Sequence, residues 1–290
     1  MTENRQARWA ARRVGPDTAG PPAVELVDAS LAYGTRTLWS GLTLAVEPGE
    51  FVAVLGPNGS GKTSLLKVLL GLVPVTGGSV AVAGSAVRRG NPDIGYIPQH
   101  RGLNAHVPLR ARDLVRLGID GHRWGPPWPS RSRNQLVDDL LDLVGASSYA
   151  NVPVNELSGG EQQRLRVAHA LATDPSVLLC DEPLLSLDLR HQRSVVELLQ
   201  RRTRDHGTAV VFVTHEINPI LPVTDRVLYI TQGAFRLGTV DEVMTSETLS
   251  ELYRSDVEVI RRGQRLIVVG ADDDEHSHHV EGDEHEKAVS

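Results

Sequence analysis

The sequence of 290 residues is long enough for one large domain, or for one domain with a subdomain, and its 40% hydrophobic content is sufficient for a sizeable core. Its single cysteine, Cys180, excludes an intramolecular disulfide and is compatible with a reducing cytosol. The net charge of −6 arises near the C-terminus, where residues 272–286 hold eight acids and only Lys287 follows as a base. The remainder is almost neutral, so we expect no nucleic-acid partner.

The two ends of the chain differ from its middle. Residues 1–22 are rich in arginine and lack the apolar core of a signal peptide, so we predict a disordered arm, with contact to anionic lipid or nucleic acid as an alternative. Residues 271–290 predict a disordered acidic tail. The apolar runs between these ends are far shorter than the roughly 20 residues that span a bilayer. We therefore expect a soluble, cytosolic protein.

Hydrophobic periodicity predicts an α/β domain over residues 23–270. The predicted strands are residues 24–34, 38–46, 51–56, 79–84, 94–98, 176–183 and 208–215 and a short pair within 226–238. The predicted helices are residues 64–72, 109–119, 134–146, 161–175 and 190–207. About residues 100–160 form a helical insertion, which contains a loop rich in proline and tryptophan at 121–132. No internal repeat is present, so we expect one nucleotide-binding unit.

A glycine-rich loop, GPNGSGKT, lies between a predicted buried strand and a helix. It matches the pattern G-x-x-x-x-G-K-[ST], in which glycines let backbone N–H groups approach phosphate oxygens at the positive end of the helix. Lys62 supplies a cation for the β- and γ-phosphates, and the Thr63 hydroxyl is the expected Mg²⁺ ligand. A chance glycine-rich turn is the alternative. The predicted ATP contacts in this loop are Gly56, Pro57, Asn58, Gly59, Ser60, Gly61, Lys62, Thr63 and Ser64.

Two carboxylates end the predicted strand SVLLCDEP. We expect Asp181 to hold Mg²⁺ through water, and Glu182 to polarise a water molecule for attack on the γ-phosphate. Two acids at the end of a strand are alternatively solvent-facing without function. The phosphate-binding loop in the same chain favours the catalytic interpretation.

The segment NELSGGEQQRLRVAHAL provides a second candidate anion-binding helix start, besides the glycine-rich loop. Ser158, Gly159 and Gly160 come directly before a predicted helix, which suits anion binding, and a plain serine N-cap is the alternative. LSGGEQQR resembles the signature motif of ATP-binding cassette (ABC) ATPases. This resemblance covers about residues 23–245. It implies an α/β, ABC-type P-loop nucleotide-binding domain with a mixed β core, an antiparallel β subdomain and a helical subdomain.

The resemblance assigns roles to four further positions. Gln99 in YIPQH is similar to the Q-loop glutamine, which senses Mg²⁺ and the attacking water, and His215 in FVTHE to the switch histidine at the γ-phosphate. Asp188 belongs to a D-loop in which Leu187 stands where relatives often carry alanine. Tyr33 in LAYG is placed to stack on adenine. The alternatives are a polar loop residue for Gln99, a strand-end histidine for His215 and core packing for Tyr33.

The resemblance also implies the partners. In this family two copies close head to tail around two ATP molecules, and the phosphate loop of one faces the Ser158–Gly160 region of the other. The chain has one loop and one signature, so we expect a second copy or a homologous partner. Members without a membrane span mostly serve a separate permease at the cytoplasmic face of the plasma membrane. That permease would dock around residues 99–124, unless the two tryptophans of the loop HRWGPPW, residues 122–128, pack within the subdomain.

Two features bear on the cargo. VTHEINPILPVTDRVLYI, residues 213–230, resembles the same segment of zinc- and manganese-type importers, and its Asn-Pro is the specific part. Imidazole and carboxylate groups of the tail suit divalent metal after entry, although a solvated tail is the alternative. The tail histidines are His276, His278, His279 and His285.

We therefore predict the ATP-hydrolysing subunit of a zinc or manganese importer, which works with a permease and an extracellular metal-binding protein. The alternatives within the family are an ABC exporter and an importer of a non-metal substrate. An ABC ATPase that acts on ribosomes or DNA is less consistent with one cassette and no long coiled coil.

Overall fold

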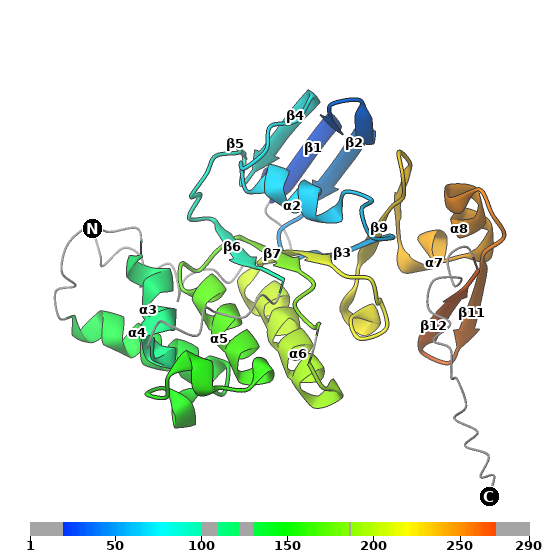
Figure 1. The fold of residues 1–290 in the computed structure, drawn as a ribbon. Helices are drawn as coiled ribbons and strands as arrows, with labels where there is room; N and C mark the ends of the chain where they lie inside the picture. Colours follow the sequence, from blue (N-terminus) through cyan, green and yellow to red (C-terminus); the bar gives the residue numbers. More distant parts are fainter. Residues whose placement is uncertain (1–19, 100–108, 122–129, 186, 271–290) are drawn as a thin grey trace, which may run out of the picture.

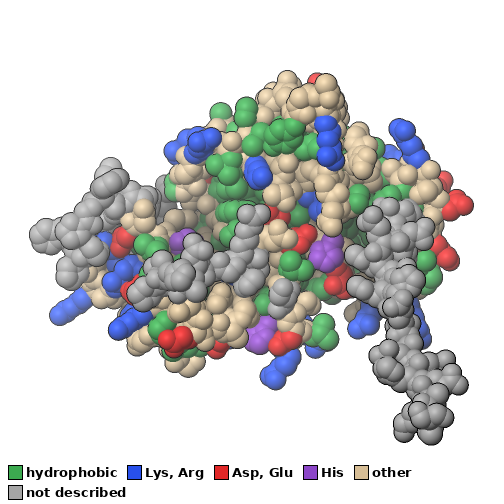
Figure 2. Space-filling model, viewed as in Figure 1, with side chains coloured by type: hydrophobic (Ala, Val, Ile, Leu, Met, Phe, Trp, Pro, Cys, Tyr) green, Lys and Arg blue, Asp and Glu red, His purple; other side chains and the backbone are tan. Residues whose placement is uncertain are grey.

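The structure is a computed structural model that describes residues 20–99, 109–121, 130–185 and 187–270 (Figure 1). Nearly all of the predicted N-terminal arm and the whole predicted tail lie outside the described residues. On the face seen in Figure 2, acidic and basic side chains of the described residues are interspersed. None of the helices that the structure describes is both long and apolar enough to cross a membrane.

A six-stranded sheet forms the centre of the molecule, in the order β10-β9-β3-β8-β7-β6. Its strands run parallel except β10, which is antiparallel to β9. All residues of β3, β7 and β8 are buried, including Cys180, as expected for strands that are covered on both faces. The strands are β3 (Phe51–Leu55), β6 (Ile94–Ile97), β7 (Val177–Asp181), β8 (Ala209–Val213), β9 (Arg226–Ile230) and β10 (Phe235–Gly238).

A second sheet is antiparallel, in the order β2-β1-β4-β5. It lies at the top of Figure 1, with a helix between it and the central sheet. The mixed and the antiparallel sheet both agree with the predicted fold class. The short strand β5 was not predicted, because two residues carry no periodicity. The strands are β1 (Val24–Tyr33), β2 (Arg36–Val46), β4 (Gly77–Val82) and β5 (Ser85–Ala86).

Five longer helices match the predicted ones within a few residues. α5 begins earlier than predicted, at Gly159, because Ser158 caps it. Figure 1 shows α3, α4 and α5 together at one end of the molecule, on the other side of the central sheet from α2. The helices are α2 (Lys62–Leu69), α3 (Ala111–Asp120), α4 (Arg131–Leu143), α5 (Gly159–Leu171) and α6 (Leu189–His206), with 3₁₀ turns at Ser147–Tyr149, Val154–Glu156 and Leu221–Val223.

Alternate side chains of β3 enter two different cores, as the two-residue period of a strand requires. Phe51, Ala53 and Leu55 belong to the core that includes α3 to α6. In that core Phe51 stacks on Phe212 with ring centroids 5.5 Å apart. Val52 and Val54 belong to the core formed with α2, β1 and β2. The central sheet is therefore the middle layer, and its strand ends are fixed from both sides.

The chain continues beyond the last predicted strand with elements that the sequence analysis did not predict. They are α7 (Val240–Val243), α8 (Ser246–Tyr253), β11 (Glu258–Arg262) and β12 (Arg265–Val269). β11 and β12 form an antiparallel hairpin with its own two-stranded sheet. Val243, Leu249 and Leu266 are buried in the same core as α3 to α6. This C-terminal unit is therefore packed onto the body.

Candidate active site

The glycine-rich loop lies where predicted, between β3 and α2. Gly56, Gly59 and Gly61 have φ angles of 136°, 75° and 105°, which glycine adopts without the steric cost of other residues. A Cβ atom on Gly56 would lie 1.9 Å from the carbonyl oxygen of Ile230, so no larger residue fits there. Gly61 offers no side chain to cap α2. The first N–H groups of that helix are therefore left to a ligand.

Lys62 is folded into this loop. Its ammonium donates to the carbonyl oxygens of Gly56, at 2.6 Å, and of Pro57, at 2.7 Å. Burial lowers the pKa of Lys62, and the negative charges of Glu182 and Asp181 act in the opposite direction. The loop thus holds a cation among backbone groups, at the place where the predicted phosphates would lie.

Asp181, at the end of β7, is only 3% exposed. Its carboxylate accepts hydrogen bonds from the Thr63 hydroxyl at 3.2 Å and from the Tyr96 hydroxyl at 3.5 Å. Burial raises the pKa of Asp181; the Thr63 hydrogen bond opposes this shift, and the charge of Glu182 adds to it. Sequence reasoning missed Tyr96. No sequence pattern marks Tyr96, because its contact follows from the register of β6 and β7, which pairs Tyr96 with Leu179, two residues before the acid.

The same residues fit Mg²⁺. Thr63 and Asp181 bring a hydroxyl and a carboxylate oxygen together, and Mg²⁺ takes a few hard oxygen ligands from protein and the rest from water and phosphate. Gln99, the third predicted ligand, is hydrogen-bonded to Glu182 beside Asp181. The three predicted ligands therefore belong to one connected cluster at one edge of the sheet.

Glu182 occupies a special backbone position directly after β7. Its φ of 47° lies in the left-handed region, where a non-glycine residue is held only by its surroundings. Its N–H donates to the Val213 carbonyl oxygen at 2.9 Å. The Gln99 amide donates to its carboxylate at 3.1 Å, and His215 Nδ1 lies 3.5 Å from the other carboxylate oxygen. His215 is 55% exposed, so the group opens to solvent.

The signature segment has a different structure. Ser158 caps α5 in a reciprocal capping box with Glu161. The Ser158 hydroxyl donates to the Glu161 carboxylate at 2.7 Å, and the Ser158 N–H donates to it at 2.9 Å. These hydrogen bonds lower the pKa of Glu161. Within the described part of the chain, no hydrogen bond or ion pair joins residues 158–160 to the phosphate loop.

The predicted D-loop residue lies beside this segment. Asp188 caps α6 by accepting the His191 N–H at 2.9 Å, and its second oxygen is 2.8 Å from His191 Nδ1. These contacts lower the pKa of Asp188. The His191 ring lies against Gly160, where an added Cβ would be 3.3 Å from it. The starts of α5 and α6 are therefore in direct contact.

Tyr33 and Arg36 pair with each other where β1 and β2 meet in the antiparallel sheet, and Arg36 contacts the phosphate loop. Tyr33, at the end of β1, is 48% exposed, which does not suit the alternative of core packing. Arg36, at the start of β2, donates to the Gly59 carbonyl oxygen at 3.1 Å. Arg36 was not predicted, because an arginine in a turn has no distinguishing sequence pattern.

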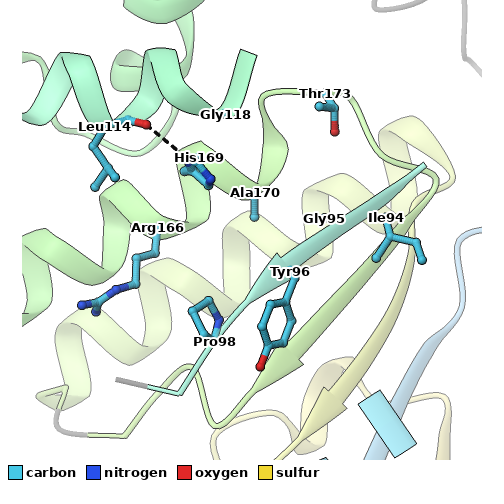
Figure 3. Close-up of a pocket in the computed structure, with 10 residues that line it drawn as sticks. All are labelled: Ile94, Gly95, Tyr96, Pro98, Leu114, Gly118, Arg166, His169, Ala170 and Thr173. Atoms are coloured by element: carbon cyan, nitrogen blue, oxygen red, sulfur yellow. Dashed lines mark hydrogen bonds between the residues drawn. The ribbon is translucent and has the colours of Figure 1, made fainter. Parts of the chain in front are cut away.

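A cavity of about 410 Å³ extends along β6 between α3 and α5 (Figure 3). Pro98, which precedes Gln99, lines it, together with Leu114 of α3 and His169 of α5. The His169 ring is hydrogen-bonded to the Leu114 carbonyl at 2.9 Å. Of the predicted docking segment, only Gln99 and residues 109–121 are described. The cavity lies at this described part, and the loop with both tryptophans, residues 122–128, lies outside the described residues.

The predicted metal-binding tail, with its four histidines, lies outside the described residues. In the part of the chain that the structure describes, no cluster of three or more His, Cys, Asp or Glu side chains could hold a metal ion. The candidate chemistry is therefore that of the phosphate loop and the carboxylates beside it.

Comparison with known protein families and solved structures identifies the family to which this chain belongs. The family model described as ABC transporter matches residues 39–185. The chain belongs to the ABC transporter family, as its signature motif indicated. The manganese transport system ATP-binding protein MntB of Halalkalibacterium halodurans is 31% identical over 86% of this chain and 98% of its own length. The zinc import ATP-binding protein ZnuC of Yersinia pestis is 30% identical over 90% of this chain and 94% of its own.

Solved structures agree with the family and with the predicted fold class. One neighbour is an inward-facing metal-chelate type ABC transporter, with a TM-score of 0.72 and 26% identity over 85% of this chain and 96% of that one. Another is a dimeric ATP-binding cassette in a post-hydrolysis state with ADP and phosphate, with a TM-score of 0.65 and 28% identity over 75% of this chain and 98% of that one. The chain is thus an ABC-type ATPase cassette that binds nucleotide.

Proposed function

We propose that this chain hydrolyses ATP to drive uptake of a divalent metal ion, zinc or manganese, through a separate membrane permease. The observation that carries the hydrolytic part is the position of Glu182. Its carboxylate lies between the Gln99 amide and His215, next to the buried Asp181. The cargo rests on the relatives, because their names assign manganese transport to one and zinc import to the other.

In this mechanism each polar group has one task. The Lys62 ammonium leaves the carbonyl oxygens of Gly56 and Pro57 and binds the β- and γ-phosphates, which stabilises charge that develops on them. Thr63 and Asp181 would hold Mg²⁺, and the ion would supply Lewis-acid stabilisation of phosphate oxygens. Glu182 takes the proton of the attacking water, and Gln99 and His215 orient that water and the γ-phosphate.

The remaining predicted contacts require a second copy. In the described part of the chain, no hydrogen bond or ion pair joins Ser158 or Gly160 to the phosphate loop, and Ser158 at the start of α5 is exposed. We propose that they complete the ATP site of a second cassette, as the D-loop residue Asp188 beside them does. ATP binding then favours the closed dimer and hydrolysis releases it, which is a population shift between two states.

The adenine ring of ATP, in this proposal, stacks on Tyr33 of the chain whose phosphate loop binds the same nucleotide.

The permease docks, in this proposal, at the cavity along β6, because Pro98 links its lining directly to Gln99 and so to Glu182. An occupant there is placed to shift the glutamine that contacts the general base. The protein would then sit at the cytoplasmic face of the plasma membrane. An extracellular metal-binding protein would deliver the cargo, and the acidic histidine tail would buffer metal after entry.

The substitution Glu182→Gln tests the hydrolytic part. It keeps the size of the side chain and removes the base, so phosphate release should fall on the order of 10²- to 10⁴-fold while ATP binding is retained. Glu216→Gln, at an exposed acid next to His215, is the matched control and should leave the rate unchanged. A Glu182→Gln protein with the normal rate would contradict the role of Glu182.

The cargo is tested by measuring total cellular zinc, manganese and iron by mass spectrometry under metal limitation. Cells carry the intact protein, no protein or the Glu182→Gln form. A lower content of zinc or manganese in both deficient strains supports import of that metal. Accumulation of the metal would mean export. An unchanged metal content would overturn the metal proposal and leave the ATPase proposal standing.

One observation favours a second cargo class. The structural neighbour with a TM-score of 0.72 is described as a metal-chelate type transporter. A chelated metal is therefore the alternative cargo. The same measurement, repeated with a chelator added to the medium, separates the two: uptake of the chelate should rise, whereas uptake of the free ion should fall because the chelator lowers its concentration.

A further inference from the structure

Asn218 makes two hydrogen bonds to a single residue far away in the sequence. Its side-chain amide donates to the Leu266 carbonyl oxygen at 2.9 Å, and its side-chain oxygen accepts the Leu266 N–H at 2.9 Å. Leu266 belongs to β12, in the C-terminal hairpin. Since both backbone groups of Leu266 point to Asn218, the asparagine side chain prolongs the hydrogen bonding of that strand edge.

The segment that carries Asn218 is the one that carries His215. After β8 the Thr214 side chain closes a tight turn by accepting the Glu216 N–H at 3.1 Å. Ile217 and Ile220 then enter the core, in which Leu266 is also buried. Residues 214–220 are thus held by apolar contacts on one side and by the Asn218 amide on the other. His215 lies at the exposed end of this segment, and its ring contacts Glu182 while more than half of its side chain is exposed.

The hairpin has independent attachments, so it is a fixed support for this segment. The Val259 N–H of β11 donates to the Ser246 hydroxyl of α8 at 2.8 Å, and Arg261 forms an ion pair with Asp241 of α7 at 2.6 Å. The Leu266 side chain is buried. A support of this kind is needed, because the His215 ring must stay within reach of Glu182, now at 3.5 Å, to act on the same phosphate.

We propose that Asn218 is a positioning residue for hydrolysis. Its two hydrogen bonds to Leu266 hold residues 214–220 against β12 and thereby keep His215 beside Glu182. The C-terminal hairpin is then energetically coupled to the ATP site, and coupling of this kind acts in both directions. This inference rests on the proposed roles of His215 and Glu182. It also gives a physical task to the Asn-Pro that served as a marker of cargo in the sequence.

The first test is Asn218→Ala, measured as ATP affinity and as turnover. The phosphate loop is untouched, so the Kd for ATP should stay within about twofold, while kcat falls roughly 10- to 100-fold, as expected when a catalytic group is misplaced by about 1 Å. Hydrogen exchange of the Leu266 amide should become faster in the same variant. An unchanged kcat would overturn the proposal.

The control is Ser246→Ala. It also removes one hydrogen bond between a side chain and the hairpin backbone, yet it leaves residues 214–220 untouched. Its kcat should equal that of the wild type, even where its melting temperature falls as much as that of Asn218→Ala. If both variants lose turnover in proportion to their loss of stability, Asn218 is merely structural and the proposal fails.

Asn218→Asp supplies a more specific readout. A protonated carboxyl presents one donor and one acceptor, as the amide does, whereas the ionised form presents acceptors only and faces the Leu266 carbonyl oxygen. Other charged groups on these two elements are Glu216, Glu258, Arg261, Arg262 and Arg265. The ratio of variant to wild-type kcat should therefore rise as the pH falls. A ratio that does not change with pH would contradict the proposed hydrogen bonds.

His215→Ala separates failure of this inference from failure of the proposed function. If His215→Ala loses turnover and Asn218→Ala does not, only the inference is wrong. If His215→Ala keeps the wild-type kcat, the proposed role of the histidine is wrong, and the inference falls with it.

Discussion

Two segments of this chain are both rich in serine and glycine at the start of a helix, but the two helix starts are capped in different ways. The segments are the phosphate loop, in which Gly61 is the N-cap of α2, and the signature segment, in which Ser158 is the N-cap of α5 and Gly159 is its first residue. In the phosphate loop three glycines take positive φ angles, and Gly61 caps α2 without a side chain. In the signature segment Ser158 and Glu161 already satisfy each other in a capping box.

The difference indicates what each helix start is ready to do. The start of α2 has backbone N–H groups without a side-chain cap and an ammonium within the loop, which makes it an anion site in a single chain. The start of α5 is complete without a ligand and is stabilised locally. Its order therefore does not depend on nucleotide, and it is available as a preformed surface for a second copy.

The largest expected effect tests the phosphate loop. Lys62→Ala removes the ammonium that is hydrogen-bonded to two carbonyl oxygens of the loop, so ATP affinity should fall roughly 100-fold, which is about 3 kcal/mol. Lys67→Ala, an exposed lysine on the same helix, is the control and should bind normally. Calorimetric titration with ATP measures both. Equal affinities for the two variants would remove the proposed distinction between the segments.

A smaller effect is expected when the signature serine is replaced by another good capping residue. Ser158→Asn keeps a side chain that caps α5, so the melting temperature should stay close to that of the wild type. ATP binding should not change, because the phosphate loop of the same chain is intact. Hydrolysis should fall roughly tenfold through the loss of one hydroxyl contact in the dimer. Retained hydrolysis would mean that Ser158 acts only as a cap.

The smallest effect concerns stability. Because burial raises the pKa of Asp181, the folded protein holds a proton at pH values where the unfolded chain has lost it. The free energy of unfolding of the nucleotide-free protein should therefore decrease as pH rises from about 4 through the raised pKa. Asp181→Asn removes this dependence, and at pH 7 it should make the nucleotide-free protein more stable than the wild type.

Urea unfolding between pH 4 and pH 8, without Mg²⁺, measures this prediction. Asp205→Asn, an exposed acid at the end of α6, serves as the control. Mg²⁺-dependent hydrolysis should be lost in Asp181→Asn only. An Asp181→Asn protein less stable than the wild type at pH 7 would mean that the carboxylate contributes to folding and does not oppose it.

Much of the fold was predictable, because its longest elements have clear periods. The buried strands around Val54 and Val211 are continuous apolar runs, and the leucines of α2 recur at helical spacing. The C-terminal hairpin was missed, although Gly263 in a two-residue turn between two short strands is a recognisable signal. β11 ends in two arginines and β12 is a continuous apolar run after its first residue, so neither strand shows the strict alternation that predicts a half-buried strand.

The site was predictable where a motif fixes chemistry and unpredictable where geometry does. Lys62, Glu182 and Ser158 follow from their motifs. Tyr96 and Asn218 do not, because their contacts depend on strand register and on a neighbour 48 positions away. In the sequence, Asn218 stands out only as part of the Asn-Pro after the switch histidine. Its two hydrogen bonds to Leu266 become visible only in the folded structure.

The burial of the single cysteine has a practical consequence for chemical labelling. Cys180 lies within the covered strand β7, and burial raises the pKa of its thiol, so it neither meets a reagent nor forms the reactive thiolate. A cysteine introduced at an exposed position is therefore the only reactive thiol of the described residues. Fluorophores, spin labels and crosslinkers can thus be attached to the chain without first replacing Cys180.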